Sequence, residues 1–172
     1  MAGRKIDRDY DAFKEKVEAG IGLEPEGTDG HYAEDYDRIV DWFKAQKPWA
    51  PDNVRVACLV VYGWMPTIFR SGKNKDFGGF AKELSNGSVS NKYHAFLNNS
   101  YVGTSKFLHF WKPEEYAIWD SRICDVLGWG HNANTKANFD KYQAYASKLA
   151  KEKGLTMRKI EQSLFLQSKT KN

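Results

Sequence analysis

Long apolar runs are missing from this 172-residue sequence. No uninterrupted apolar stretch approaches the roughly 18 residues that a membrane span needs, so we expect a soluble protein without a membrane partner. Met1 to Lys5 run into charged residues instead of an apolar signal segment, which favours a cytoplasmic location.

Cysteine and histidine are scarce, and both are scattered along the chain. Cys58 and Cys124 lie in separate apolar stretches, without a second cysteine or a histidine at the spacing of metal ligands. No two of the four histidines have the i, i+4 spacing of a helical metal site. We therefore predict two buried thiols, no metal and no cofactor.

Charge is distributed unevenly between the two parts of the sequence. Residues 1–60 contain 9 Lys/Arg and 13 Asp/Glu, whereas residues 61–172 contain 17 Lys/Arg and 9 Asp/Glu. An excess of positive charge suits a polyanionic partner, because each Lys or Arg near a phosphate releases counterions. Solvated lysine-rich helix faces give the same pattern, so the charge alone leaves DNA binding open.

The periodicity of the apolar residues predicts an all-α fold. We expect one compact multi-helix domain over residues 1–172, because no repeat and no linker-like tract interrupts the chain. The apolar run at 54–62 fits a strand or a helix, and we predict a helix because no other segment offers a strand to pair with. The expected helices are residues 7–19, 33–46, 54–62, 77–84, 89–97, 104–111, 121–127, 135–153 and 156–167.

Asp120 is the candidate for chemistry, because several aromatic residues lie within ten positions of this one carboxylate. As the residue before the amphipathic stretch 121–127, it is also a natural helix N-cap. Flat rings beside an acid suit a pocket for a base turned out of a duplex, and they equally suit a core. Tyr62, Trp64 and Trp119 are the predicted walls of such a pocket.

Val102-Gly103-Thr104 reads as a turn that opens a helix. Backbone N–H groups at a helix N-terminus attract phosphate, and Lys106 would lie in the first helical turn. A simple turn is the alternative interpretation. The residues predicted to contact DNA are Val102, Gly103, Thr104, Ser105, Lys106 and Arg122.

The run from Val102-Gly103 to Ile118-Trp119-Asp120-Ser121-Arg122-Ile123 resembles the helix-hairpin-helix DNA glycosylases. In that family a glycine-rich hairpin precedes a helix, and a V-D-T-H-V-like segment supplies the catalytic aspartate. Asp120 matches that aspartate in this sequence. The resemblance implies an all-helical fold, DNA as substrate, and a hairpin that grips a backbone phosphate. It also implies that Asp120 stabilises positive charge on the sugar as the base leaves.

The resemblance further indicates which kind of glycosylase to expect. Lyase-capable members have a Schiff-base lysine two residues after the hairpin glycine, where this chain has Ser105, and Lys106 falls one residue late. We therefore predict a monofunctional enzyme that hydrolyses the N-glycosidic bond of a damaged or modified base. Two alternatives stay open, a non-catalytic DNA-binding module and a base-modifying enzyme that acts on a flipped, hypermodified nucleotide.

Overall fold

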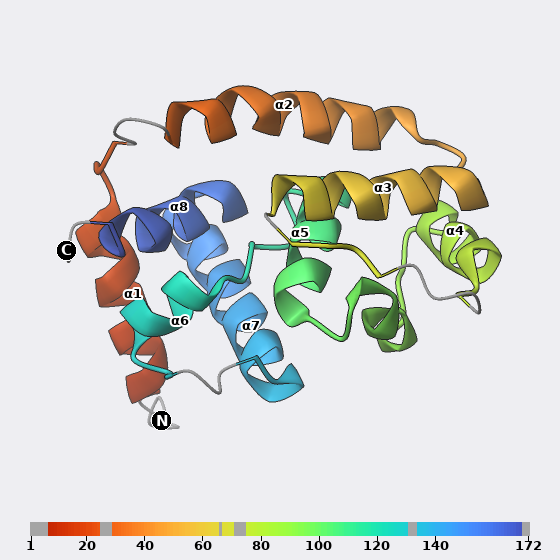
Figure 1. The fold of residues 1–172 in the computed structure, drawn as a ribbon. Coiled ribbons are helices and arrows are strands. Elements are labelled where there is room, and N and C mark those ends of the chain that lie inside the picture. Colours follow the sequence, from red (N-terminus) through yellow and green to blue (C-terminus); the bar gives the residue numbers. More distant parts are fainter. Residues whose placement is uncertain (1–6, 25–28, 66, 71–74, 131–133, 170–172) are drawn as a thin grey trace. The chain divides into compact units, whose positions relative to one another are not determined.

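The described part of the chain is all-helical, as the sequence predicts (Figure 1). The computed structural model describes residues 7–24, 29–65, 67–70, 75–130 and 134–169. Within these residues there are eight α-helices and one 3-10 helix, and no strand. No helix among them is both long enough and apolar enough to cross a membrane.

The helices group into two compact units. Unit 1 comprises Met1–Pro25 and Glu114–Asn172, and unit 2 comprises Glu26–Pro113. Unit 1 is therefore discontinuous in sequence, whereas unit 2 is one uninterrupted stretch. The single domain expected over residues 1–172 stays a prediction.

Unit 1 is organised around its last helix. It contains α1 (Arg8–Gly20), α6 (Ser121–Leu127), α7 (Lys136–Lys153) and α8 (Met157–Gln167), and α8 packs against the other three. A Cβ atom on Gly20 would lie 2.0 Å from the backbone oxygen of Ser163, so α1 and α8 touch backbone to backbone. Gly20 is still helical, and it is Gly22 that takes the positive φ of 100° after α1.

Unit 2 is built around helix α5 (Tyr101–Trp111), in which every residue except Val102 is buried. It also contains α2 (Asp29–Ala45), α3 (Pro51–Trp64), α4 (Phe77–Ser85) and the 3-10 helix η1 (Asn91–Leu97). Helix α5 packs against α2, α3 and η1, and α4 packs against α3. Because α3 includes residues 54–62, the prediction of a helix for that apolar run is confirmed.

Aromatic rings form the core of unit 2. The Phe107 ring lies 5.4 Å from Phe43, 5.1 Å from Phe80 and 6.3 Å from Trp49, measured between ring centroids. Edge-to-face and offset contacts at such distances stabilise a core beyond the area that they bury. Helix α5, which carries Phe107, is thereby fixed in place.

Side-chain caps determine where many of the helices begin. In each case a side-chain oxygen before the helix accepts a hydrogen bond from a backbone N–H of its first turn, which stabilises the start by about 1 kcal/mol. The cap at Ser100 starts α5 at Tyr101, three residues before the start predicted at Thr104. The capping residues are Asp7, Asp76, Ser100, Asp120, Thr135 and Thr156.

Candidate active site around Asp120

Asp120 is held at the N-terminus of α6 in unit 1. Its backbone is extended, with φ of −142° and ψ of 153°, and its Oδ1 accepts a hydrogen bond of 3.0 Å from the N–H of Arg122. The residue is half-buried. The predicted N-cap is therefore confirmed, and it fixes the direction of the carboxylate.

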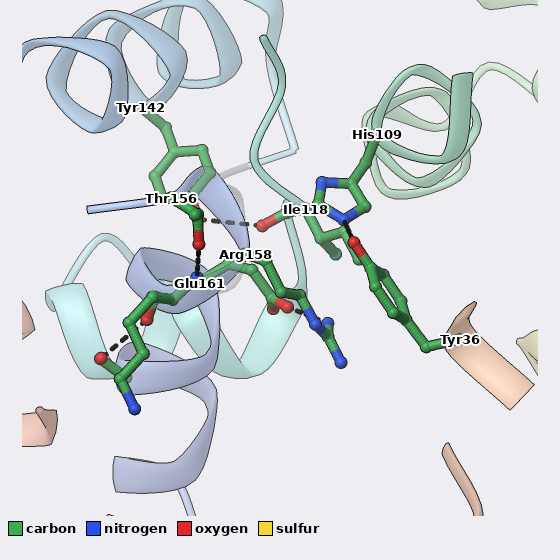
Figure 2. A network of polar contacts seen from close by, with 9 residues as sticks. Tyr36, His109, Ile118, Tyr142, Thr156, Arg158 and Glu161 are labelled. Carbon is green, nitrogen blue, oxygen red and sulfur yellow. Dashed lines mark hydrogen bonds and ion pairs between the residues drawn. The ribbon is translucent and has the colours of Figure 1, made fainter. Parts of the chain in front are cut away.

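The non-helical segment before Asp120 is attached to α7 by two side chains. The N–H of Ala117 donates to Gln143 Oε1 at 2.9 Å, and Gln143 Nε2 donates to the carbonyl of Ala117 at 2.7 Å. The Tyr142 hydroxyl donates to the carbonyl of Ile118 at 2.9 Å (Figure 2). Nothing in the local sequence around Asp120 indicates these partners.

Trp119 packs in the core of unit 1. Its side chain is 0% exposed, and its ring lies 5.0 Å from Tyr142 and 5.6 Å from Trp129. A wall of a base pocket needs an accessible ring face, so this structure gives Trp119 a packing role. Arg122, in contrast, is exposed, and its guanidinium carbon lies 5.6 Å from the centroid of the Phe165 ring.

Two groups near Asp120 are kept protonated by their surroundings. Burial, followed by the charges of Asp120 and Asp125, raises the pKa of the Cys124 thiol to about 12. Burial, followed by the charge of Glu161, also raises the pKa of Tyr142 well above its ordinary value. Cys124 is thus a buried thiol, as predicted, and Tyr142 stays a hydrogen-bond donor.

The sequence pattern does not indicate the buried carboxylate of Glu161 in α8. Glu161 is 3% exposed and pairs with Arg158 one helical turn away (Figure 2). The segment reads as an ordinary amphipathic helix. A buried charge is costly unless it is paired, so we expect the loss of Arg158, which would leave the Glu161 carboxylate without this partner, to be destabilising.

In unit 2, the predicted turn at Val102-Gly103-Thr104 is wrong, because all three residues lie inside α5. The turn before α5 is formed by Asn98 and Asn99, with φ of 57° and 52°, a conformation that asparagine tolerates better than most residues. The N–H of Gly103 donates to the Ser100 hydroxyl at 3.3 Å, which caps the helix.

Three of the predicted DNA contacts, Thr104, Ser105 and Lys106, are buried in α5. The Ser105 hydroxyl donates to the carbonyl of Val102 at 2.9 Å, and its side chain is 0% exposed. The Thr104 hydroxyl lies 2.9 Å from His94 Nδ1. Lys106 is 9% exposed, and its Nζ lies 5.4 Å from the centroid of the Trp64 ring. Of the six predicted DNA contacts, Val102 is half-buried and Arg122 is exposed.

The two predicted pocket walls of unit 2 differ in exposure. Tyr62 is buried, and its hydroxyl donates to the carbonyl of Leu97 at 2.5 Å. Trp64 is half-buried and meets Phe110 edge to face at 5.2 Å. Both residues belong to α3, which ends at Trp64.

Two histidines of unit 2, His94 and His109, have side-chain partners in the structure. His109 is fully buried, and its Nε2 lies 2.8 Å from the Tyr36 hydroxyl (Figure 2). His94 stacks on Tyr101 at 3.8 Å, and burial lowers the pKa of this imidazole. Both histidines connect elements within unit 2.

The predicted site residues are divided between the two units. Trp119, Asp120 and Arg122 belong to unit 1, and the predicted residues from Tyr62 to Lys106 belong to unit 2. Within the described residues, no three His, Cys, Asp or Glu side chains are grouped so as to hold a metal ion. Comparisons with protein-family models, curated proteins and solved structures gave no match to this chain.

Proposed function

We propose that this protein is a DNA glycosylase-like enzyme that removes a damaged or modified base by hydrolysis of its N-glycosidic bond. The observation that supports this proposal most is the fixed carboxylate of Asp120, which is half-buried and oriented by the N–H of Arg122. Its position in the sequence is that of the catalytic aspartate in the family that this segment resembles.

The proposed reaction needs such a carboxylate. When the bond between C1′ and the base nitrogen breaks, its electron pair leaves with the base and positive charge develops on the sugar. The oxygen of a water molecule then bonds to C1′ and gives up a proton, while the departed base is protonated. A carboxylate held in advance stabilises the charged transition state more than the neutral ground state, which is what accelerates a reaction.

The environment of α5 favours a monofunctional enzyme. A Schiff base requires a lysine amine that reaches C1′, and Ser105 takes that position in the resemblance. Lys106 points its Nζ toward the Trp64 ring and is almost fully buried. Water is therefore the nucleophile in our proposal.

DNA is the proposed partner because the basic excess lies in residues 61–172. Arg122 is exposed and follows Asp120 by two residues, so it is suited to pair with the phosphate next to the reacting sugar. We expect the DNA affinity to fall with salt, with a slope of log affinity against log salt of about −0.9 for each phosphate contacted.

The test uses two DNA duplexes that carry a sugar analogue without a base, so the recognised base does not have to be identified. One carries a pyrrolidine nucleotide, whose protonated nitrogen mimics the cationic sugar, and the other carries a neutral tetrahydrofuran nucleotide. We expect at least about tenfold tighter binding of the cationic duplex, as for a weak transition-state analogue. In Asp120→Asn this preference should disappear while the neutral duplex still binds, because asparagine keeps the cap but not the charge.

A non-catalytic DNA-binding module is the second candidate, and one observation favours it. The hydrogen bond from Arg122 N–H accounts for Asp120 as a cap without any reaction. In that case the parental protein binds both duplexes equally, and Asp120→Asn changes neither affinity. Equal binding by the parental protein would therefore remove the proposed enzymatic function.

A further inference from the structure

We propose that Gln143 and Tyr142 are positioning residues, which hold the main chain before Asp120 so that the carboxylate meets the developing positive charge. This inference rests on the proposed function and assigns a second element, α7, to the same site. Neither residue needs to touch the substrate for this role.

Gln143 acts as a hydrogen-bonding partner for Ala117, a residue outside the helices. Ala117 and Ile118 are buried and belong to no helix or strand, so their backbone polar groups need partners other than water. The side-chain amide of Gln143 offers one acceptor and one donor, and it uses both on Ala117, at 2.9 and 2.7 Å. A neighbouring strand would supply the same pair of bonds.

Tyr142 adds a second attachment on the following residue. Its hydroxyl donates to the carbonyl of Ile118 at 2.9 Å, and the side chain is fully buried. Two attachments on consecutive residues restrict both the displacement and the rotation of the segment. Because burial and the charge of Glu161 raise the pKa of Tyr142, this donor keeps its proton at neutral and moderately alkaline pH.

Asp120 follows this doubly attached segment by only two residues. The buried ring of Trp119 occupies the one position between them, and the N–H of Arg122 holds the carboxylate from the other side. The carboxylate is therefore fixed from both directions along the chain. Placement at this level matters because a shift of about 1 Å at a reacting group is enough to cost on the order of 100-fold in rate.

The experiment measures the preference for the cationic over the neutral duplex in Gln143→Met, which has a similar size and no hydrogen-bonding amide. We expect the preference to fall from at least about tenfold to less than about threefold, since the transition-state mimic depends on placement. The affinity for the neutral duplex should stay within about twofold of the parental value, because phosphate contacts supply it.

Gln167→Met is the matched control. Gln167 is also a glutamine in unit 1, and its side chain donates to the carbonyls of Lys16 and Ser163, far along the chain from Asp120. Its replacement deletes these hydrogen bonds and leaves those between Gln143 and Ala117 in place. If the preference for the cationic duplex falls in Gln143→Met but keeps its parental value in Gln167→Met, the positioning role is supported. If the preference falls equally in both variants, the cause is a general loss of stability.

A second pair of variants covers the possibility that Gln143→Met does not fold. Tyr142→Phe removes only the bond to Ile118, and Tyr10→Phe removes a comparable bond of 2.7 Å to Glu152 elsewhere in unit 1. We expect the preference for the cationic duplex to fall in Tyr142→Phe and to keep its parental value in Tyr10→Phe. An unchanged preference in Tyr142→Phe and in a folded Gln143→Met overturns the positioning role and leaves the proposed function intact. A parental protein without any preference overturns the function itself.

Discussion

Gly103 offers the sharpest test of how α5 is packed, because a neighbouring side chain leaves no room for a Cβ atom at this position. A Cβ atom added there would lie 2.5 Å from the Tyr62 hydroxyl oxygen and 3.1 Å from the ring carbon that bears it. The Tyr62 ring is buried and bonded to the carbonyl of Leu97, so it has little room to move. We therefore attribute the glycine to this close approach.

The expected cost of Gly103→Ala follows from that geometry. Overpacking of a core typically costs about 1–3 kcal/mol, and alanine returns up to about 1 kcal/mol through its better helix propensity. From a central overpacking cost of about 2 kcal/mol, this return leaves a net loss of about 1–2 kcal/mol, which lowers Tm by roughly 2–8 °C for a protein of this size. Gly63→Ala is the matched control, because Gly63 is exposed in α3 and a Cβ there meets nothing within 4 Å.

A double-mutant cycle with Tyr62→Phe identifies the contact responsible. The single change removes the hydroxyl and its bond to Leu97, at a cost of about 1 kcal/mol in unfolding free energy. With the oxygen gone, Gly103→Ala should cost about 1 kcal/mol less than in the parental protein, and urea unfolding measures this coupling. Additive costs would refute the close approach. A Gly103→Ala protein of parental stability would also contradict the close approach.

Three further predictions test other parts of the chain. Gly20→Ala should lower the unfolding free energy by about 1–3 kcal/mol or more, because its Cβ would meet the backbone of Ser163. Unchanged urea unfolding would contradict the close packing of α1 and α8. Borohydride should trap no covalent adduct on a DNA substrate, since the buried Lys106 does not act as a nucleophile, and an adduct lost in Lys106→Ala would reverse this assignment. Lys153 Nζ lies 2.8 Å from Glu18 Oε1, and its hydrogen bond lowers the pKa of the Glu18 carboxyl. The stabilisation of the fold by this pair should therefore be complete above about pH 4.5 and be lost as the pH falls through the lowered pKa. An NMR titration should find an ordinary pKa for Glu18 in Lys153→Ala, and the same low value in both proteins would exclude the pair as its cause.

Local signals explain why the all-α fold and the cap at Asp120 were predictable. Helical periodicity and capping residues act within a few positions of the chain, so they can be read directly from the sequence. The start of α5 was misplaced because Gly103 reads as a turn, whereas Asn98 and Asn99 make the turn. The glycine is needed for a contact with Tyr62, 41 positions earlier, and no local pattern signals it.

The attachment of Asp120 to α7 was not predictable for the same reason. Gln143 and Ala117 are 26 positions apart, and an isolated glutamine in a lysine-rich helix reads as a solvated residue. Glu161 likewise reads as the polar face of α8, although it is buried. The proposed role of Asp120 in catalysis stays a prediction, because a fixed carboxylate is necessary for the reaction but also serves as a helix cap.

The discontinuous make-up of unit 1 imposes an order on its assembly during translation. Helix α1 leaves the ribosome early, but its main packing partner is α8, whose residues are synthesised some 140 positions later. Unit 2 is continuous and can collapse while the ribosome is still making α7, since compact units fold as they emerge. We therefore expect α1 of the nascent chain to lack its main packing partner until α8 has been synthesised, so that unit 1 completes its packing after unit 2.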